Sequence, residues 1–285
     1  MISSQALAQA PPPTVTVATP LSRVIADWDE STGRFTPSQS VEVRPRVTGF
    51  VDALYFRDGQ LVKPGDLLFT IDPRPYQIAV DSTQADVDRT SAAVEIAALE
   101  VHRGEPLVPA QALPQSQLDM RRSTLRQAQA NRDSALAALH NAQLNLSWTE
   151  VRAPIAGRIS DRRVDVGNLV NGGQNGMTPT LLTTIVALDP IYLEFDAAEA
   201  DYLKYVRLAH SGQRPSGRIV RNPVEVKLQD ETTWLHKGTL DFIDNVVNSR
   251  SGTIRGRGIF DNGDQLLTLE DLREFGYGPE TPKCC

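Results

Sequence analysis

Cysteine is almost absent from this sequence, and histidine is sparse. Among 285 residues the only cysteines are Cys284 and Cys285, an adjacent pair at the end of the chain. An adjacent pair provides neither a disulfide framework nor the spacing of a metal-ligand set. The four histidines are scattered, and no two stand at the i, i+4 spacing that places two imidazoles on one helix face. We therefore expect neither a metal nor any other cofactor.

Long apolar runs are also missing. No stretch of about 18 apolar residues occurs, so the sequence predicts no membrane-spanning helix. Near the start, SQALAQAPPP contains Ala8-Gln9-Ala10, which has the A-x-A form that precedes signal cleavage, but a basic start and an apolar core are lacking. Residues 1–13 are therefore either the stub of an export signal or a flexible leader, and both interpretations stay open.

An excess of positive charge and any catalytic motif are missing as well. The formal net charge is -6 and the pI is about 5.3, which argues against a nucleic acid as partner. The sequence contains no G-x-S-x-G, P-loop or H-E-x-x-H motif. Asp196, Asp241 and Asp244 lie in different segments without the spacing or glycine of a Ca²⁺ loop, so we interpret them as solvated strand edges. The chain is predicted not to be an enzyme.

What the sequence does contain is an internal repeat. VRPRVTGFVDALYFRDGQLVKPGD, residues 43–66, returns in outline as VRAPIAGRISDRRVDVGNLVNGGQ, residues 151–174, at a constant offset of 108 positions. So many like pairs at one offset indicate a duplicated unit. The matched pairs are Arg44 and Arg152, Val47 and Ile155, Gly49 and Gly157, Val51 and Ile159, Phe56 and Val164, Gly59 and Gly167, Leu61 and Leu169, Val62 and Val170, and Gly65 and Gly173.

Each copy predicts short strands with alternating apolar positions, separated by glycine-containing turns. Gly49, Gly59 and their mates in the second copy suit sites that need a positive φ or a close approach of another strand. One copy alone is too small to bury a face of a sheet. We therefore expect residues 41–73 and 149–183 to close on each other as one flattened β-sandwich.

The repeat resembles the two half-motifs of a lipoyl or biotinyl domain, whose halves are related by an internal pseudo-twofold axis. Carrier proteins of that family present a modified lysine on the hairpin that joins the halves. No lysine lies between Lys63 and Lys204, so a biotin or lipoyl carrier is only a remote alternative. An ordinary duplicated sandwich without specific relatives is the other interpretation that stays open.

Residues 74–148, between the two copies, predict two long helices. Apolar or small residues recur in steps of four and three, as in a heptad seam, and about 30 residues per helix give a length of roughly 45 Å. Three prolines and a glycine at 104–114 break the helix, so we expect an antiparallel coiled-coil hairpin. The seam positions are Tyr76, Val80, Thr83, Val87, Thr90, Val94, Ala97 and Val101 in the first helix, and Leu118, Leu125, Ala128, Ala135, Leu139, Ala142 and Leu146 in the second, which Arg121 and Arg132 interrupt.

The first predicted helix is rich in acidic residues and the second in arginine. These residues either pair across the seam or form separate solvated faces, and an exposed pair would contribute little to stability. The residues concerned are Asp81, Asp86, Asp88, Glu95 and Glu100 in the first helix and Arg121, Arg122, Arg126 and Arg132 in the second.

A third region is predicted at 184–260. IYLEF leads into a short helix at 197–209, and three strand-like stretches follow, VEVKL, GTLDFIDNVV and GTIRGRGIF. This succession predicts a β-barrel of about six strands with one helix, and N-terminal strands within 14–40, notably at 24–37, feed this barrel or a membrane-proximal region. Residues 261–285 are short and polar and are expected to be an atypical tail.

A split lipoyl-like domain with a coiled-coil hairpin between its halves resembles the periplasmic adaptor subunits, or membrane fusion proteins, of resistance-nodulation-division (RND) tripartite efflux pumps. The resemblance covers residues 14–260 and is carried by VRPRVTGFV, VKPGDLLFTIDPRPYQ, LNLSWTEVRAPIAGRIS and LDPIYLEFDAAEADYL. It implies a mainly β fold with a long helical hairpin, and a membrane-proximal domain built from both termini. Because 261–285 do not match that domain, we expect it to be largely truncated.

The resemblance also implies a partner-binding site at the hairpin tip. In this family an Arg, a Leu and a Ser near the tip contact the outer-membrane channel. Arg103 and Leu107 stand at the matching four-residue spacing, whereas Pro114 occupies the place of the Ser and Ser116 follows two residues later.

Further partners follow from the same resemblance. It implies an inner-membrane drug–proton antiporter of the RND class, self-association into a ring of several copies, and membrane association through these partners. The implied location is the periplasm of the Gram-negative cell envelope, at the inner membrane, and the implied role is multidrug resistance by efflux. An adaptor of an ATP-driven exporter or of a type I secretion system is the alternative.

Overall fold

The computed structural model describes residues 24–25, 29–173, 176–213, 216, 218–269, 272–277 and 283–284, without side chains in 24–25, 272–277 and 283–284. The chain falls into two compact units. One contains Phe35–Tyr192 together with Asp261–Leu269, and the other is built around Leu193–Phe260. The leader expected at 1–13 lies outside the described residues.

The two copies of the repeat exchange strands. The first copy forms β3 (Gly49–Leu54), β4 (Leu61–Val62) and β5 (Leu67–Ile71), and the second forms β6 (Glu150–Arg152), β7 (Gly157–Ile159) and β8 (Leu169–Val170). β3 pairs with β8, and β4 pairs with β7. The expected closure of the two halves into one lipoyl-like sandwich is confirmed.

The register of these pairings obeys the pseudo-twofold axis. Gly49 lies opposite Val170, and its repeat mate Gly157 lies opposite Val62, the mate of Val170. The backbone hydrogen bonds repeat the relation, since the amide of Val51 donates to Asn168 at 2.9 Å and the equivalent amide of Ile159 donates to Gln60 at 2.9 Å.

The repeated glycines have the two roles that the sequence suggested. Gly59 and its mate Gly167 have positive φ angles of 78° and 90°, a conformation that side chains with a Cβ adopt only under strain. Gly49 and Gly157 instead allow close packing: a Cβ at Gly49 would stand 2.6 Å from Ile71 Cγ2, and one at Gly157 would overlap the backbone of β9.

The core of the sandwich draws equally on both copies. Leu68, Phe69, Ile71 and Val170 are fully buried, and Phe56 meets Phe69 edge-on with ring centroids 5.3 Å apart. The repeat mates Val51 and Ile159, Phe56 and Val164, and Val62 and Val170 all lie in this cluster. Neither half could bury its apolar face without the other.

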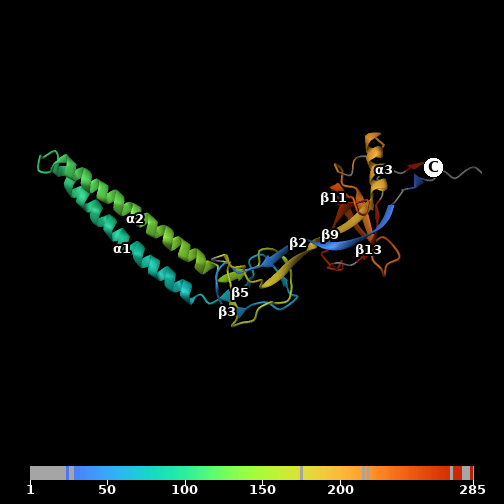
Figure 1. Cartoon of the computed structure of the whole chain (residues 1–285), viewed down its shortest axis with the longest axis horizontal. Helices are drawn as coiled ribbons and strands as arrows, with labels where there is room; N and C mark the ends of the chain where they lie inside the picture. The colour runs from blue at the N-terminus through green and yellow to red at the C-terminus, as the bar shows by residue number, and fades with distance from the viewer. Residues whose placement is uncertain are drawn as a thin grey trace, which may run out of the picture. The chain divides into compact units, whose positions relative to one another are not determined.

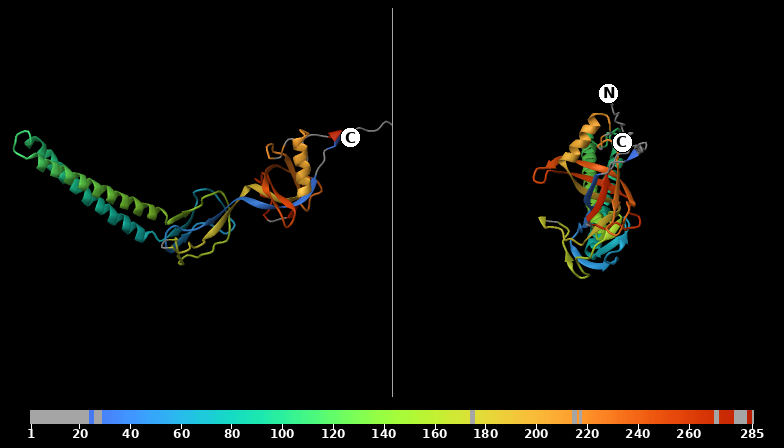
Figure 2. Two further views of the ribbon diagram at one scale, coloured as in Figure 1. Left: turned by 45° about the horizontal axis from the view of Figure 1, so that its top comes forward. Right: turned by 90° about the vertical axis from the view of Figure 1, so that its right-hand side faces the viewer.

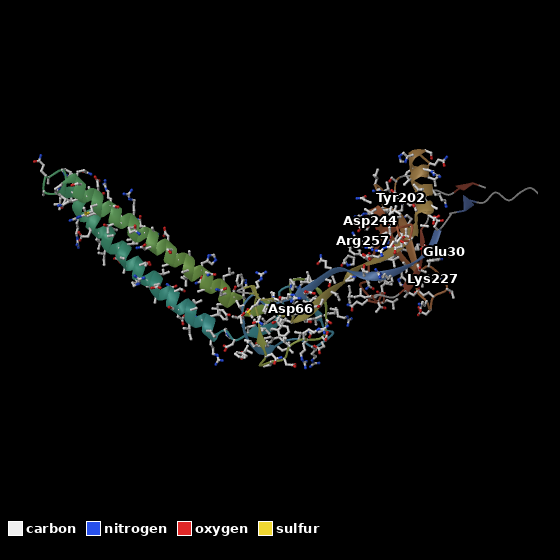
Figure 3. All side chains as sticks on the ribbon, viewed as in Figure 1. Glu30, Asp66, Tyr202, Lys227, Asp244 and Arg257 are labelled. Atoms are coloured by element: carbon white, nitrogen blue, oxygen red, sulfur yellow. The ribbon has the colours of Figure 1, made fainter. Side chains whose placement is uncertain are left out.

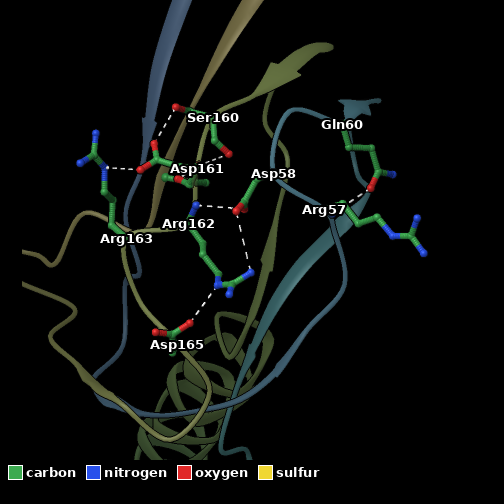
Figure 4. Close-up of polar contacts among 9 residues, drawn as sticks. Arg57, Asp58, Gln60, Ser160, Asp161, Arg162, Arg163 and Asp165 are labelled. Atoms are coloured by element: carbon green, nitrogen blue, oxygen red, sulfur yellow. Dashed lines mark hydrogen bonds and ion pairs between the residues drawn. The ribbon is translucent and has the colours of Figure 1, made fainter.

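Polar contacts also join the two halves at the turns that follow β3 and β7 (Figure 4). The Arg162 amide donates to Asp58 Oδ1 at 3.1 Å, and the Arg162 guanidinium lies between Asp58 and Asp165. Asp165 raises the pKa of Arg162 through a hydrogen bond at 2.8 Å. The pairs are exposed, so they fix the turns more than they stabilise the domain.

Between β5 and β6 the chain forms the helical hairpin (Figure 1). α1 (Arg74–Gly104) has 31 residues, α2 (Gln115–Ser147) has 33, and the short 3₁₀ helix η1 (Glu105–Leu107) follows α1. The predicted seam is confirmed, because every predicted position is buried or half-buried, as are the interrupting Arg121 and Arg132. Both helices begin and end within about two residues of the predicted bounds.

The base of the hairpin is tied to the sandwich. Asp72, directly before α1, accepts hydrogen bonds from the Arg74 backbone amide at 3.1 Å and from its guanidinium at 2.7 and 2.8 Å. These bonds lower the pKa of Asp72 from 3.8 to about 2. The Tyr76 hydroxyl donates to the Thr48 carbonyl at 2.6 Å, and Arg46 lies over the Trp148 ring at 5.5 Å.

The second unit is a closed β-barrel with one helix beside it (Figure 2). Its strands follow one another around the barrel in the order β12, β11, β10, β13, β2, β9, and β12 also pairs with β9. The predicted barrel and helix are confirmed. The bounds are β2 Asp29–Val43, β9 Thr183–Ala198, α3 Glu199–His210, β10 Pro223–Lys227, β11 His236–Asn248, β12 Thr253–Phe260 and β13 Leu272–Tyr277.

The expected end of the barrel at residue 260 is wrong. β13, inside the stretch that we expected to be an atypical tail, pairs with β10 on one side and with β2 on the other. Without it, the edges of β10 and β2 would be left unpaired, so a strand from this stretch is what closes the sheet. Farther along, β14 (Lys283–Cys284) pairs with β1 (Val24–Ile25).

The linker after β12 packs against the first unit. Asn262, 1% exposed, donates from its backbone amide to Asp189 at 2.9 Å and from its side chain to the Leu188 and Leu267 carbonyls at 3.0 and 3.1 Å. Its side-chain oxygen accepts the Leu267 amide at 3.0 Å. Every polar atom of this buried amide group therefore has a partner.

Candidate partner-binding site at the hairpin tip

The tip of the hairpin comprises the end of α1, η1, the turn that follows, and the start of α2. The turn is closed by backbone hydrogen bonds, in which the amides of Ala112 and Leu113 donate to the Leu107 carbonyl at 2.9 and 3.2 Å. Gln111 takes a positive φ of 57°, and Pro114, at φ -62° and ψ 142°, starts α2. These bonds give a proline-rich turn a defined conformation.

A small apolar cluster supports the tip from inside. Val101, Leu113 and Leu118 are buried against one another, and Val108 and Leu125 pack against them half-buried. Leu113 and Val108 come from the turn itself, so the turn folds back onto the seam. The tip is therefore an ordered surface.

Arg121 clamps the two helices together just below the turn. Its guanidinium donates to the Glu100 backbone carbonyl at 2.9 Å and pairs with the Glu100 carboxylate at 3.3 Å. Gly104 makes room for it, since a Cβ at that position would stand 3.2 Å from Arg121 Nη1. A second pair, Arg122 with Glu105 at 3.0 Å, joins α2 to η1.

These clamps decide between the two interpretations of the charged helices. Glu100 and Glu105 meet arginines of α2 near the tip, whereas Asp86 pairs with Arg89 of its own helix at 3.2 Å. Pairing across the hairpin is thus a feature of the tip. The sequence signal for it was an arginine at a seam position, Arg121, which needs a carbonyl or carboxylate partner when half-buried.

Of the two predicted site residues, Arg103 is the charged one. It occupies the last turn of α1, where a cation is favoured by the helix dipole, and its side chain is 69% exposed. Within the described residues it pairs with Glu100, one helical turn back, at 3.2 Å. The guanidinium therefore keeps donors facing solvent, ready for a carboxylate or carbonyl of another protein.

Leu107, the second predicted residue, ends η1 and is 39% exposed. The structure brings Arg103 and Leu107 to the same end of the hairpin, separated by a single helical turn. The exposed residues around Leu107 include four short apolar ones, Pro106, Pro109, Ala110 and Ala112, together with the polar Glu105 and Gln111. An apolar patch with polar neighbours and a guanidinium beside it is compatible with a protein-binding surface.

The third expected contact, a serine, is replaced. Pro114 is exposed at the start of α2, and Ser116 is also exposed in the first turn of that helix. Proline has no side-chain donor, so Pro114 cannot reproduce a hydroxyl contact. Ser116 is the nearest hydroxyl along the chain.

Among the described residues, no group of three or more His, Cys, Asp and Glu side chains is placed to hold a metal ion. In the barrel, Asp241 pairs with Arg257 at 2.6 Å, and Asp244 accepts backbone amides of the next two residues. Asp241 is exposed on β11, in agreement with our interpretation of it as a solvated residue, and it is in addition ion-paired with Arg257 of β12.

Two protein-family models match the chain. One describes the barrel-sandwich hybrid domain of RND membrane fusion proteins and matches residues 39–184. The other describes the β-barrel domain of RND membrane fusion proteins and matches residues 190–272. The second match extends into β13, in agreement with the structure. No helix within the described part of the chain has the length and apolar character that crossing a membrane requires.

Curated relatives are similar over most of this chain. Multidrug export protein AcrE of Escherichia coli K12 is 35% identical over 238 residues, which cover 84% of this chain and 60% of AcrE. Multidrug efflux pump subunit AcrA of the same organism is 33% identical over 257 residues, covering 90% of this chain and 63% of AcrA. The chain thus spans about three fifths of the length of these relatives.

Solved structures share the fold. A MacA–MexA chimera that carries the Pseudomonas aeruginosa MexA α-hairpin has a TM-score of 0.66 at 23% identity, covering 92% of this chain and 86% of the chimera. The membrane fusion protein Spr0693 of Streptococcus pneumoniae R6 has a TM-score of 0.64 at 15% identity, covering 89% of this chain and 99% of that protein. With the matched family models and the split sandwich around a helical hairpin, these findings establish that the chain belongs to the RND membrane fusion protein family.

Proposed function

We propose that this chain is a non-enzymatic periplasmic adaptor. It links an inner-membrane drug–proton antiporter of the RND class to an outer-membrane channel, and so serves the efflux of small molecules. The observation that carries the proposal is a lipoyl-like sandwich, split by a hairpin with an ordered and exposed tip, in a chain of the RND membrane fusion protein family. Its relatives AcrA and AcrE bear names of multidrug efflux and export.

In this proposal the tip contacts the channel. Arg103 supplies donors to backbone or carboxylate oxygens of the channel, and Leu107 enters an apolar depression beside them. Two observations support these roles. Arg103 is mostly exposed and forms only an exposed ion pair with Glu100, and Leu107 is exposed although it is apolar. Ser116 is the candidate for the third contact, displaced by two residues from the family position.

A ring of several copies raises the strength of such a contact. One tip offers only a few side chains, so its affinity for the channel is weak. When several tips meet one channel together, each further tip binds at a high effective concentration. We therefore propose self-association around the conduit at the inner membrane, with membrane association through the partners.

Helix length separates this proposal from one form of the alternative, an adaptor of a type I secretion system, whereas an adaptor of an ATP-driven exporter stays the alternative. Helices of 31 and 33 residues match a short hairpin, whereas adaptors of type I secretion systems are expected to have much longer ones. Mechanical reach is therefore limited to about 50 Å at 1.5 Å per residue. The antiporter-linked adaptor is the function that this length favours.

The test uses two matched variants of the full chain. Arg103→Asp reverses the charge at the tip, and Arg89→Asp reverses it at an equivalent exposed arginine that pairs with Asp86 at the same spacing and the same 3.2 Å distance. Co-purification with the cognate channel is measured for both variants, alongside the melting temperature.

We expect Arg103→Asp to reduce channel recovery several-fold while Arg89→Asp leaves it unchanged. Both variants lose only a solvent-screened pair, worth about 0.2–1 kcal/mol, so their melting temperatures should stay close to that of the parent chain. Equal recovery of the channel with all three proteins would overturn the role of Arg103. Failure of the parent chain to recover both the pump and the channel would overturn the adaptor function itself.

A further inference from the structure

The barrel unit contains a chamber between α3 and the strands. Its volume is about 550 Å³, within the range of small-molecule sites. α3 forms one side of it with Tyr202, Tyr205, Val206 and Ala209, and strands β2, β9, β11 and β12 form the others. Figure 2 shows α3 lying beside the barrel, and Figure 3 marks Tyr202 and Glu30 in this unit.

The apolar face of α3 is not packed against a dry core. Tyr202, Tyr205, Val206 and Ala209 recur at helical spacing and face the strands, yet no residue of α3 is buried. An amphipathic helix of a globular domain normally buries this face. In α3 these four residues are only half-buried, because the chamber lies between the helix and the strands.

The opposite side of the chamber is rigid and apolar. Leu240 and Ile254 are each 3% exposed and belong to the barrel core. The ring of Phe195 lies directly over Gly256, where a Cβ would overlap it, so the glycine in β12 leaves room for the ring. The chamber wall is therefore set by the barrel and does not depend on a ligand.

The charges at the chamber favour a cation. Within the described residues, the carboxylates of Glu30 and Asp201 have no side-chain hydrogen bond or ion pair, although both residues line the chamber. Asp29, also at the chamber, is engaged by the Tyr205 hydroxyl and by Lys204 at 3.5 Å. Within the described part of the chain these two exposed carboxylates have no counter-charge, and they stand beside apolar walls.

Among the described residues that line the chamber, the one arginine already has several partners. Arg218 donates to the Asp244 carbonyl at 2.8 Å, to Asn245 Oδ1 at 2.7 Å and to the Tyr202 hydroxyl at 3.2 Å, and it lies over the Tyr202 ring at 5.7 Å. A guanidinium held in this way is poorly placed to bind an anionic ligand.

We propose that this chamber binds one small lipophilic monovalent cation. The apolar body of the ligand fills the space between α3 and the barrel wall, and its positive charge lies toward Glu30 and Asp201. The proposal goes beyond the adaptor function, which requires no contact between the chain and a transported molecule, and it does not depend on that function.

The experiment is calorimetric titration of the full chain with two probes of nearly equal shape and opposite charge, tetraphenylphosphonium and tetraphenylborate. We expect saturable binding of one tetraphenylphosphonium per chain, and at least about fivefold weaker binding of the anion, from two solvent-screened charge interactions. No binding of the cation, or equal binding of both ions, would overturn the proposal.

Matched variants locate the site. Ala209→Trp places an indole in the chamber and should abolish binding, whereas Leu203→Trp, on the exposed face of the same helix, should leave it unchanged. Glu30→Gln with Asp201→Asn should weaken binding of the cation by about two- to fivefold per carboxylate and should strengthen binding of the anion, because the same two charges repel it. Undiminished cation binding by Ala209→Trp would contradict the location.

Because Ala209→Trp could fail to bind through misfolding alone, a measurement on the parent chain tests the location of the site independently. Hydrogen exchange of the α3 amides should slow when tetraphenylphosphonium is added, and should slow less at the same concentration of tetraphenylborate. Protection confined to other segments would place the bound cation elsewhere and would overturn the assignment.

Discussion

The lipoyl-like sandwich and the helical hairpin are neighbours in the chain but differ in how deeply they bury their apolar side chains. The sandwich has side chains that are fully buried, such as Leu68, Phe69 and Ile71, because two sheets enclose them. In the hairpin the most buried seam residues of α1 keep 7–8% exposure, because two helices alone provide no third layer. The sandwich is stabilised by a fully buried core, whereas the hairpin has a less deeply buried core and extends over a greater length.

The comparison also explains where each region places its polar contacts. The sandwich uses them at turns, as with Arg162 between Asp58 and Asp165. The hairpin uses them at its two ends: Asp72 and Tyr76 fix the base, and Arg121 clamps the tip to Glu100. A long two-helix arm without a deep core needs its ends fixed if it is to present a defined surface.

The largest loss of stability is expected from a mutation in the sandwich core. Phe69→Ala removes a fully buried ring from the sandwich and should lower the free energy of unfolding by about 3–5 kcal/mol. Phe50→Ala, on the exposed side of β3 at 57% exposure, is the control and should change it little. Chemical denaturation measures both, and similar losses in the two variants would show that the sandwich core is not where the structure puts it.

In the hairpin the matching test introduces a charge. Val87→Asp places an unpaired carboxylate in the seam and should cost about 2–3 kcal/mol, with loss of helical signal in circular dichroism. Ile96→Asp makes the same kind of change on the exposed face of α1 and should be almost silent. If the spectrum of Val87→Asp were unaffected, α1 and α2 would not pack along this seam.

A subtler pair of variants tests the pseudo-twofold relation. Gly59→Ala and Gly167→Ala each force a Cβ into a positive-φ conformation with open space around it, so each should cost about 1–2 kcal/mol for backbone reasons alone. Gly263→Ala is the control, because Gly263 has no positive φ and an added Cβ would meet only Asp189 Oδ2, at an ordinary contact distance of 3.9 Å. Clearly unequal effects of the two repeat mates, in denaturant melts, would break the equivalence of the halves.

The smallest effect is expected at the base of the hairpin, from pH. Because the pKa of Asp72 is lowered from 3.8 to about 2, its carboxylate favours the folded state above pH 3.8, and this contribution is lost as the pH falls toward 2. An NMR titration of the Asp72 carboxyl should give a midpoint near 2, and Arg74→Ala should bring it back toward 3.8. A midpoint at 3.8 in the parent chain would mean that the Asp72–Arg74 contact does not form in solution.

Much of this architecture could be predicted from local pattern. The constant offset of the repeat predicted that the two halves close on each other as one sandwich, and the pairings of β3 with β8 and of β4 with β7 confirm it. The hairpin bounds followed from the heptad steps and from the prolines between them. Both signals are periodic, and periodicity is what a single sequence displays most clearly.

The features that escaped prediction depend on non-local pairing. β13 is a six-residue strand in a polar stretch, and only its partners β10 and β2, far away in the sequence, make it a strand. The chamber between α3 and the strands could not be predicted either, because the apolar residues of α3 have the spacing of an ordinary packed helix. The clamp of Arg121 on Glu100 needed the register of α1 against α2, which the heptad pattern alone does not fix.

The central claim is that the sandwich supports the hairpin and that the hairpin tip binds the outer-membrane channel. Site-specific photo-cross-linking in cells that contain the channel tests it most directly. A photoreactive residue at Leu107 probes the tip, and one at Ile78, which is also exposed and apolar, probes the base of α1. The account predicts a cross-link to the outer-membrane channel from position 107 and none from position 78. A channel adduct at 78 without one at 107 would contradict it.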